Sequence, residues 1–213
     1  MREQIERLTK LTTDLLDLSQ LDAGAIVVKA DSVDLSALAR DVALEFGPRA
    51  DQHGSRLELR RPSRPVIARA DLHGSRLQLR TPEQPAIALG DPDRVRQIIR
   101  ILLDNALTHT PEGTKVTVNT YFANRRAELT ISDEGSGIPQ RAQKRIFERF
   151  YTAESAGGSG LGLAIAKELA QRMKGEITIS SSRRFTAFTL DLPPGVRGPD
   201  APRSSRTPVR TGT

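Results

Sequence analysis

Apolar residues recur at helical spacing along the first 22 positions of the chain. These apolar residues lie three or four positions apart, with charged and polar residues between them: Ile5, Leu8, Leu11, Leu15, Leu18 and Leu21. This pattern predicts one amphipathic helix over residues 3–22, which ends at Gly24. Its leucines need a surface to cover them. That surface is either the same domain or a second chain in a helix bundle, and the bundle is at least as strongly favoured.

The remaining pattern alternates helices with short strands. Asp34 or Ser36 caps a second helix, predicted to run to about Phe46 before Gly47-Pro48. Further helices are expected at 91–108, with Pro92 in the first turn, at 140–149, and from the glycines at 157–162 to Gly175. Strands are predicted near 57–59, 77–79, 115–122, 126–132, 176–181 and 185–192, with a hairpin turn at 123–124. This order predicts an α+β fold, a two-layer α/β sandwich in which helices cover one face of a mixed sheet.

A 20-residue segment is duplicated in tandem. Residues 49–68 and 69–88 are identical at 14 of 20 positions. Two copies are too few for a solenoid. We interpret them as a repeated strand–turn–strand unit, and favour a tolerated surface hairpin over a dedicated docking element.

Charge and composition narrow the function classes. The net charge is +6, and the segment 194–213 carries +3 of it within a Pro/Ser/Thr/Gly-rich stretch, so a disordered basic tail is expected at 195–213. The rest is mildly basic with mixed signs, which gives no strong nucleic-acid signal. The chain has no cysteine, which excludes disulfides and thiolate metal sites, and no apolar run of membrane-spanning length. A cytoplasmic location is expected.

Two polar stretches are candidates for chemistry. Asn105 lies among leucines on the predicted long helix, where its amide is either a satisfied core group or an oxygen ligand for Mg²⁺. The segment 133–139, Asp-Glu-Gly-Ser-Gly-Ile-Pro, follows a predicted strand. It is either a plain turn or a place where the Asp133 carboxylate accepts a hydrogen bond from a base amino group.

Two later stretches extend the series. Phe147, Phe150 and Tyr151 fall within five residues and at minimum anchor a loop. The glycine-rich run 157–163 immediately precedes a predicted helix, where free backbone N–H groups and the helix dipole favour phosphate. It is neither a P-loop nor a dinucleotide fingerprint. Four such stretches in one order predict a single pocket.

Together these stretches resemble the N, G1, F and G2 boxes of the histidine-kinase branch of the Bergerat-fold (GHKL) ATPases. The resemblance covers about residues 1–193, with 1–24 similar to the second helix of a dimerisation hairpin and 34–194 similar to the ATP-binding domain. It implies that ATP and Mg²⁺ are the cofactors, that Asn105 holds Mg²⁺, that Asp133 binds the adenine amino group, and that 147–159 form a lid. The implied ATP-binding residues are Asn105, His109, Asp133, Gly135, Gly137, Ile138, Phe150, Gly158, Gly160, Leu161, Gly162, Leu163 and Thr186.

The sequence departs from the family pattern near the phosphates. Ile101 replaces a usual Asn, Thr108 a frequent Lys or Arg, and Thr152 an Arg. Arg183 and Phe185 replace glycines, and no Lys or Arg lies between Arg149 and Lys167. Weak ATP affinity is therefore expected, because charge-assisted phosphate contacts are stronger than neutral ones.

None of the three histidines has the helical setting of the family's phosphoacceptor. His53 and His73 occupy equivalent places in the repeat, and His109 falls in the N box. We therefore expect a split or truncated kinase without its own phosphoacceptor.

The expected function is phosphoryl transfer from ATP to a histidine on a partner protein, and through it to a response regulator. Oligomerisation through helix 3–22 is part of this expectation. The main alternative is a catalytically weak or inactive ATP-binding scaffold. A serine kinase is disfavoured by the bundle-like helix, and gyrase-like hydrolysis is disfavoured because Ile101 cannot activate water.

Overall fold

The computed structural model of the chain describes residues 2–58, 79–80, 86–152 and 159–196. Most of the duplicated segment and the predicted basic tail lie outside these residues. In chain order the elements are α1 (Arg2–Asp22), β1 (Asp31–Asp34), α2 (Leu35–Gln52), β2 (Arg56–Glu58), β3 (Leu79–Arg80), β4 (Ile87–Gly90), α3 (Pro92–Thr108), β5 (Lys115–Ala123), β6 (Arg126–Asp133), α4 (Gln140–Gln143), α5 (Gly162–Arg172), β7 (Glu176–Ser182) and β8 (Phe185–Leu192).

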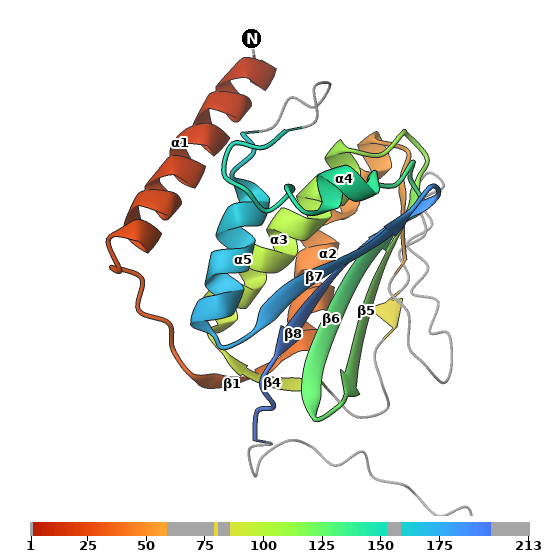
Figure 1. The fold of residues 1–213 in the computed structure, drawn as a ribbon. Helices are drawn as coiled ribbons and strands as arrows, with labels where there is room; N and C mark the ends of the chain where they lie inside the picture. Colours follow the sequence, from red (N-terminus) through yellow and green to blue (C-terminus); the bar gives the residue numbers. More distant parts are fainter. Residues whose placement is uncertain (1, 59–78, 81–85, 153–158, 197–213) are drawn as a thin grey trace, which may run out of the picture.

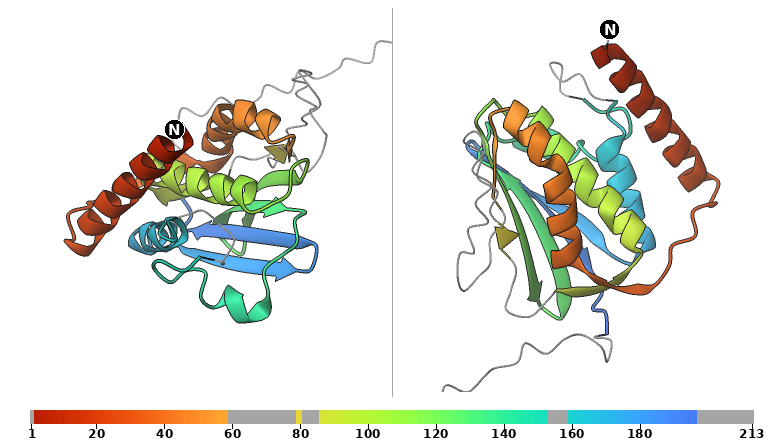
Figure 2. Two further views of the ribbon diagram at one scale, coloured as in Figure 1. Left: turned by 90° about the horizontal axis from the view of Figure 1, so that it is seen from above. Right: turned by 180° about the vertical axis from the view of Figure 1, so that it is seen from behind.

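The fold has two layers, as predicted (Figure 1). The main sheet has the strand order β2-β5-β6-β8-β7, with β3 also pairing with β5. β2 and β3 run parallel to β5 and the other pairs are antiparallel, so the sheet is mixed. Helices α2, α3 and α5 lie side by side on one face of this sheet (Figure 2). A separate antiparallel pair, β1 with β4, was not predicted.

Alternation along β6 decides which of its side chains enter the core. Ala127, Leu129, Ile131 and Asp133 are buried, while the residues between them are partly exposed. Side chains two residues apart share one face of a strand, so the apolar positions and Asp133 all point towards the helix layer. The burial of Asp133 therefore follows from strand geometry.

Two predicted helix boundaries are wrong. α2 does not end at Phe46 but continues through Gly47 and Pro48 to Gln52. Proline clashes with the Cβ of a preceding helical residue, and glycine at 47 has no Cβ, so the helix passes through. The predicted helix at 140–149 is only one turn, Gln140–Gln143, followed by turns to about residue 150.

Helix α1 lies outside the helix layer, alongside α5 (Figure 1, Figure 2). Its C-terminal half is docked, since Leu18 and Leu21 are buried. Arg172 of α5 also donates to the Leu21 carbonyl at 2.6 Å. A different set of apolar residues on α1 is exposed: Ile5, Leu8, Leu15 and Leu16. Across the described part of the chain, no helix combines the length and the apolar character that crossing a membrane requires.

Asp91 joins the segment after α1 to the start of α3. It is buried, and its Oδ1 accepts from the Asp93 and Arg94 backbone N–H groups at 2.9 and 3.2 Å. Its Oδ2 accepts from the Lys29 N–H at 3.0 Å. One carboxylate thus satisfies two unpaired donors of the helix and one of a distant loop.

Asp91→Ala is expected to lower the free energy of unfolding by about 2 kcal/mol, because it removes the cap and leaves buried N–H groups unpaired. Denaturant unfolding measures the change. Asp93→Ala, at an exposed position of the same turn, is the control and should change it by less than about 0.5 kcal/mol. Equal losses for the two variants would contradict the assignment of Asp91 as a cap.

Candidate functional site

The predicted stretches meet at one cavity of about 500 Å³. Its wall comes from α1, α2, α3, the loop between β6 and α4, α4, the segment around Tyr151, the start of α5 and β8. Nine of the predicted site residues line it: Asn105, His109, Asp133, Gly137, Ile138, Gly160, Gly162, Leu163 and Thr186. Segments that are far apart in the sequence are therefore brought together as expected.

Asp133 is a buried residue of the cavity wall, at the end of β6. It is 6% exposed, and its Oδ1 accepts the Gly135 N–H at 3.0 Å. Burial raises its pKa to about 6, although the Gly135 hydrogen bond acts in the opposite direction. Thr186 of β8 is its partner across the sheet and is also buried. The site thus holds a carboxylate that titrates near neutrality and faces an open space.

Helix α3 contributes the long wall of the cavity. Ile101, Asn105 and Thr108 are four and three residues apart, so they share one face of the helix, and all three line the cavity. Ile99 and Leu103, on the opposite side of the helix, are fully buried in the core. The amphipathic pattern of α3 therefore aims Asn105 into the cavity.

Two glycines are fixed by their neighbours in the protein itself. Gly137 has φ +74°, and a Cβ there would lie 1.5 Å from the Ser182 carbonyl oxygen. Gly160 has φ +68°, and a Cβ there would lie 2.7 Å from the Phe150 carbonyl carbon. Both positions require glycine because backbone passes close by in a left-handed conformation. The loops that border the cavity are thus held against other backbone segments.

Four of the predicted site residues do not line the cavity. Gly135 lies directly against Asp133, and a Cβ at Gly135 would lie 2.8 Å from the Asp133 carboxylate. Leu161 is fully buried in the core, and Phe150 is exposed at φ +62° with its N–H bonded to Gly160. Gly158 lies outside the described residues. Contact of these four with a ligand stays a prediction.

Several cavity residues were not predicted, and the most unexpected come from α1. Lys10 and Asp14, one helical turn apart, both line the cavity. Asp14 accepts a hydrogen bond from Ser159 Oγ at 2.6 Å, and burial raises its pKa despite that bond. Periodicity places both residues on the polar side of α1, but it does not show what that side contacts.

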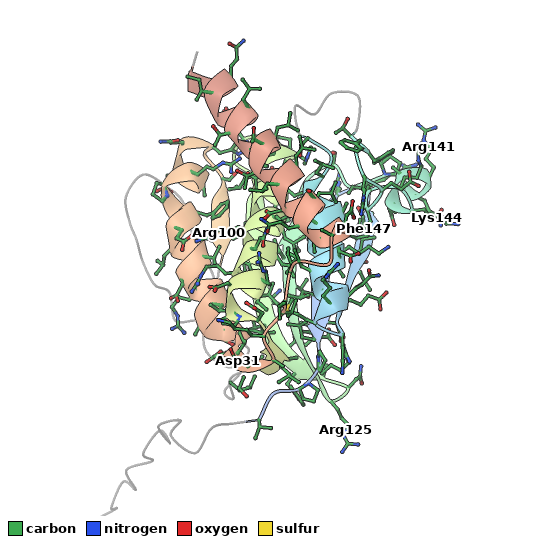
Figure 3. All side chains as sticks on the ribbon, turned by 90° about the vertical axis from the view of Figure 1, so that its left-hand side faces the viewer. Asp31, Arg100, Arg125, Arg141, Lys144 and Phe147 are labelled. Atoms are coloured by element: carbon green, nitrogen blue, oxygen red, sulfur yellow. The ribbon has the colours of Figure 1, made fainter. Side chains whose placement is uncertain are left out.

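Asp104 lies near Lys10 in the cavity wall and holds two cationic side chains there. It forms ion pairs with Lys10 of α1 and with Arg49 of α2. Burial alone would raise the pKa of Asp104, but the hydrogen bonds and charges of Lys10 and Arg49 hold it below its usual value. Arg100, seen at the near side of α3 in Figure 3, also lines the cavity and pairs with Glu45 at 2.8 Å.

The pKa of the His109 imidazole lies below its ordinary value, because desolvation outweighs the attraction of Asp104. His53, the other described histidine, instead bonds Ser55 through its ring at 2.6 Å and does not line the cavity.

The buried Asp133 carboxylate should destabilise the fold at neutral pH. Its pKa in the folded chain lies above the ordinary 3.8, so the folded chain holds this proton more tightly, and its contribution to stability falls between about pH 4 and pH 6. Asp133→Asn is therefore expected to raise the free energy of unfolding at pH 7.5 by about 1–3 kcal/mol. Asparagine still accepts the Gly135 N–H.

Denaturant unfolding at pH 4.5 and 7.5 measures this change. Glu134→Gln is the matched control: it removes the same charge from the adjacent exposed residue, which pairs with Lys115 at 3.3 Å, and should change stability by less than about 0.5 kcal/mol. A loss of stability at pH 7.5 in Asp133→Asn would contradict the prediction.

Comparison with known proteins supplies the family. A profile described as "Histidine kinase-, DNA gyrase B-, and HSP90-like ATPase" matches residues 90–196. "Probable sensor histidine kinase TcrY" of Mycobacterium tuberculosis is 34% identical over 195 residues, which are 89% of this chain and 36% of that protein. "Signal transduction histidine-protein kinase BaeS" of Escherichia coli is 30% identical over 200 residues, 91% of this chain and 38% of that protein. The chain thus spans less than two fifths of these curated relatives.

Solved structures agree with the profile. ShkA, crystallised at full length in complex with AMPPNP, matches with a TM-score of 0.71 at 28% identity, over 92% of this chain and 38% of that one. The mycobacterial sensor histidine kinase MprB matches with a TM-score of 0.59 at 28% identity, over 78% of this chain and 97% of that one. The predicted α+β fold is confirmed. The chain belongs to the histidine kinase-, DNA gyrase B- and HSP90-like ATPase family, and the relatives that it matches are sensor histidine kinases.

Proposed function

We propose that the chain binds ATP in this cavity and transfers its γ-phosphoryl group to a histidine on a partner protein in a two-component system. The observation that carries the proposal is the Asp133 carboxylate, which is buried in the cavity wall beside Thr186. A carboxylate in that place accepts a hydrogen bond from the exocyclic amino group of adenine. It rejects guanine, which presents a carbonyl oxygen there.

Asn105 fits the proposed Mg²⁺ site. It lines the cavity beside Asp104, and Mg²⁺ typically takes one or two protein oxygens together with phosphate oxygens and water. No cluster of three or more His, Cys, Asp or Glu among the described residues competes as a metal site. Bound there, the ion would neutralise charge on the phosphates. The protein's own part is to orient the nucleotide, since phosphoryl transfer depends mainly on positioning and electrostatics.

Helix α1 supports the assignment of a partner. Its exposed apolar residues, Ile5, Leu8, Leu15 and Leu16, have no cover among the described elements, whereas Leu18 and Leu21 are docked. A helix with a free apolar stripe gains stability from a second helix. We propose that this stripe packs in a bundle with the histidine-bearing partner or a second copy, with a response regulator as the next acceptor.

A binding module without kinase turnover is the second candidate. Ile101, Thr108 and Thr152, where the family pattern has polar or cationic residues, all line the cavity. This wall offers a phosphate group two hydroxyls and an apolar side chain. Binding of ATP without transfer to any histidine-bearing partner would favour this candidate.

ATP affinity should depend on pH through Asp133. Because the pKa of Asp133 is about 6 and only the ionised form is a pure acceptor, affinity is expected to fall about tenfold from pH 7.5 to pH 5. Calorimetry with MgATP measures it. Asp133→Asn should bind ATP far more weakly, and any pH dependence of its affinity that remains arises from protonation of the ATP phosphates. A wild-type profile no steeper than that of Asp133→Asn would exclude Asp133 as the adenine ligand.

Phosphoryl transfer is tested with γ-labelled ATP and a candidate partner that carries a histidine on a helical hairpin. Acid-labile, base-stable label is expected on the partner, and it should be absent when the partner histidine is replaced by glutamine. Asp133→Asn should abolish transfer, and Glu134→Gln, the neighbouring exposed change, should preserve it. Label on this chain alone would overturn the proposal.

A further inference from the structure

The cavity has two ends of different character. Asp133 and Thr186 lie at the sheet end, whereas Asp104, Ser159 and Gly160 lie where α3 and the start of α5 approach α1. The second end is where a polyphosphate would lie if the base is bound by Asp133. This step rests on the proposed function.

The lid segment supplies no cation to that end. The sequence has no Lys or Arg between Arg149 and Lys167. Arg149 is held by Asp22 through two hydrogen bonds of 2.8 and 2.6 Å, and the Lys167 ammonium lies over the Phe147 ring at 5.4 Å. Arg149, within the predicted lid, and Lys167, after it, are therefore engaged elsewhere.

Cations do reach the polyphosphate end, but they come from other helices. Lys10 extends from α1 to Asp104, and Arg49 extends from α2 to Asp104 and, at 3.2 Å, to Thr108 Oγ1. Arg49 thus lies beside the residue at which the family pattern has a Lys or Arg. Of the two, Lys10 is in the cavity wall.

Lys10 is well placed to exchange partners. Its side chain is 52% exposed and that of Asp104 is 17% exposed, so the ammonium lies at the solvent side of the pair. Lysine carries a compact charge on a flexible four-carbon stem, and Arg49 remains to neutralise Asp104 if the ammonium turns towards a phosphate. The Lys10–Asp104 ion pair thus holds a cation in the cavity wall when no nucleotide is bound.

We propose that Lys10 of α1 is a ligand of the β- and γ-phosphates, and that Asp104 holds it in position until the nucleotide binds. The nucleotide site is then completed by a helix outside the matched family segment, 90–196. The opposite role for Lys10 is a plug that occupies the phosphate position, and it makes the opposite prediction for affinity.

Lys10→Met, which keeps most of the stem and removes the charge, tests the proposal in the full chain. Calorimetry with MgATP, ADP and AMP should show a loss of ATP affinity of about fivefold to twentyfold, a smaller loss for ADP, and less than about twofold for AMP. Lys10→Arg should recover most of the loss. Arg125→Gln, at the exposed turn far from the cavity (Figure 3), removes the same charge and should leave all three affinities unchanged.

The outcomes separate the two levels of the proposal. Unchanged or tighter ATP binding in Lys10→Met would overturn the role of Lys10 while leaving the nucleotide site intact, and tighter binding would identify the plug. Equal losses for ATP and AMP would make Lys10 a structural residue only. Wild-type chain that binds none of the three nucleotides would overturn the proposed function, and this inference with it.

Discussion

The site depends on one carboxylate that strand alternation forces into the interior. Ala127, Leu129, Ile131 and Asp133 share the buried face of β6, so the last of them ends beneath the helix layer with one backbone N–H as its hydrogen-bond partner. Isolated buried charge is costly, and the raised pKa of Asp133 expresses that cost. A bound donor would relieve it. The ionised Asp133 carboxylate therefore lowers the stability of the fold, and it is suited to accept a hydrogen bond from a ligand.

The surroundings of Asp133 are set mainly by backbone. Gly135 leaves room for the carboxylate, and Gly137 leaves room for the Ser182 carbonyl of the last hairpin. The Ile138 N–H donates to Ser181 Oγ at 2.8 Å, which fixes the same loop to the same hairpin. Because these contacts join ordered strands to the loop, the sheet end of the cavity, where Asp133 lies, is preorganised before a ligand binds.

The other end of the cavity is organised by charge. Asp104 is one residue from Asn105 on α3, and it draws one cation from α1 and another from α2. Side-chain ion pairs at a partly open surface are weaker and more adjustable than buried backbone contacts. The cavity therefore combines a rigid end, suited to recognising a base, with an adjustable end, suited to a group that is transferred.

The sequence predicted those parts of the fold that local pattern determines. α3 was predicted within one residue, because Asp91, Pro92 and the apolar stripe act together, and the hairpins β5–β6 and β7–β8 followed from alternation. Asp133 and Asn105 were predicted to be site residues from residue type and position, and both line the cavity. α2 was predicted too short because Gly47-Pro48 is typical of helix ends, although glycine is also the residue that permits a helix to pass a proline.

Contacts between distant helices could not be predicted in the same way. Lys10 and Asp104 are 94 residues apart, and Asp14 and Ser159 are 145 apart. Periodicity shows that α1 has a polar side but not that this side closes a cavity. Such a contact depends on how the segment between α1 and β1 directs the helix, and that direction is set by tertiary bonds such as those of Asp91 to Lys29 and of Arg172 to Leu21.

The two sides of α1 then become energetically linked. Its exposed apolar stripe is suited to pack against a partner helix, while Lys10 and Asp14, on the other side of the helix, line the cavity. If Lys10 binds phosphate, nucleotide favours the docked position of α1, and by thermodynamic reciprocity a partner that holds α1 in this position strengthens nucleotide binding by the same factor. A partner that draws α1 away weakens it equally. The position of α1, and with it the position of its apolar stripe, would then depend on nucleotide binding through the Lys10 ammonium group.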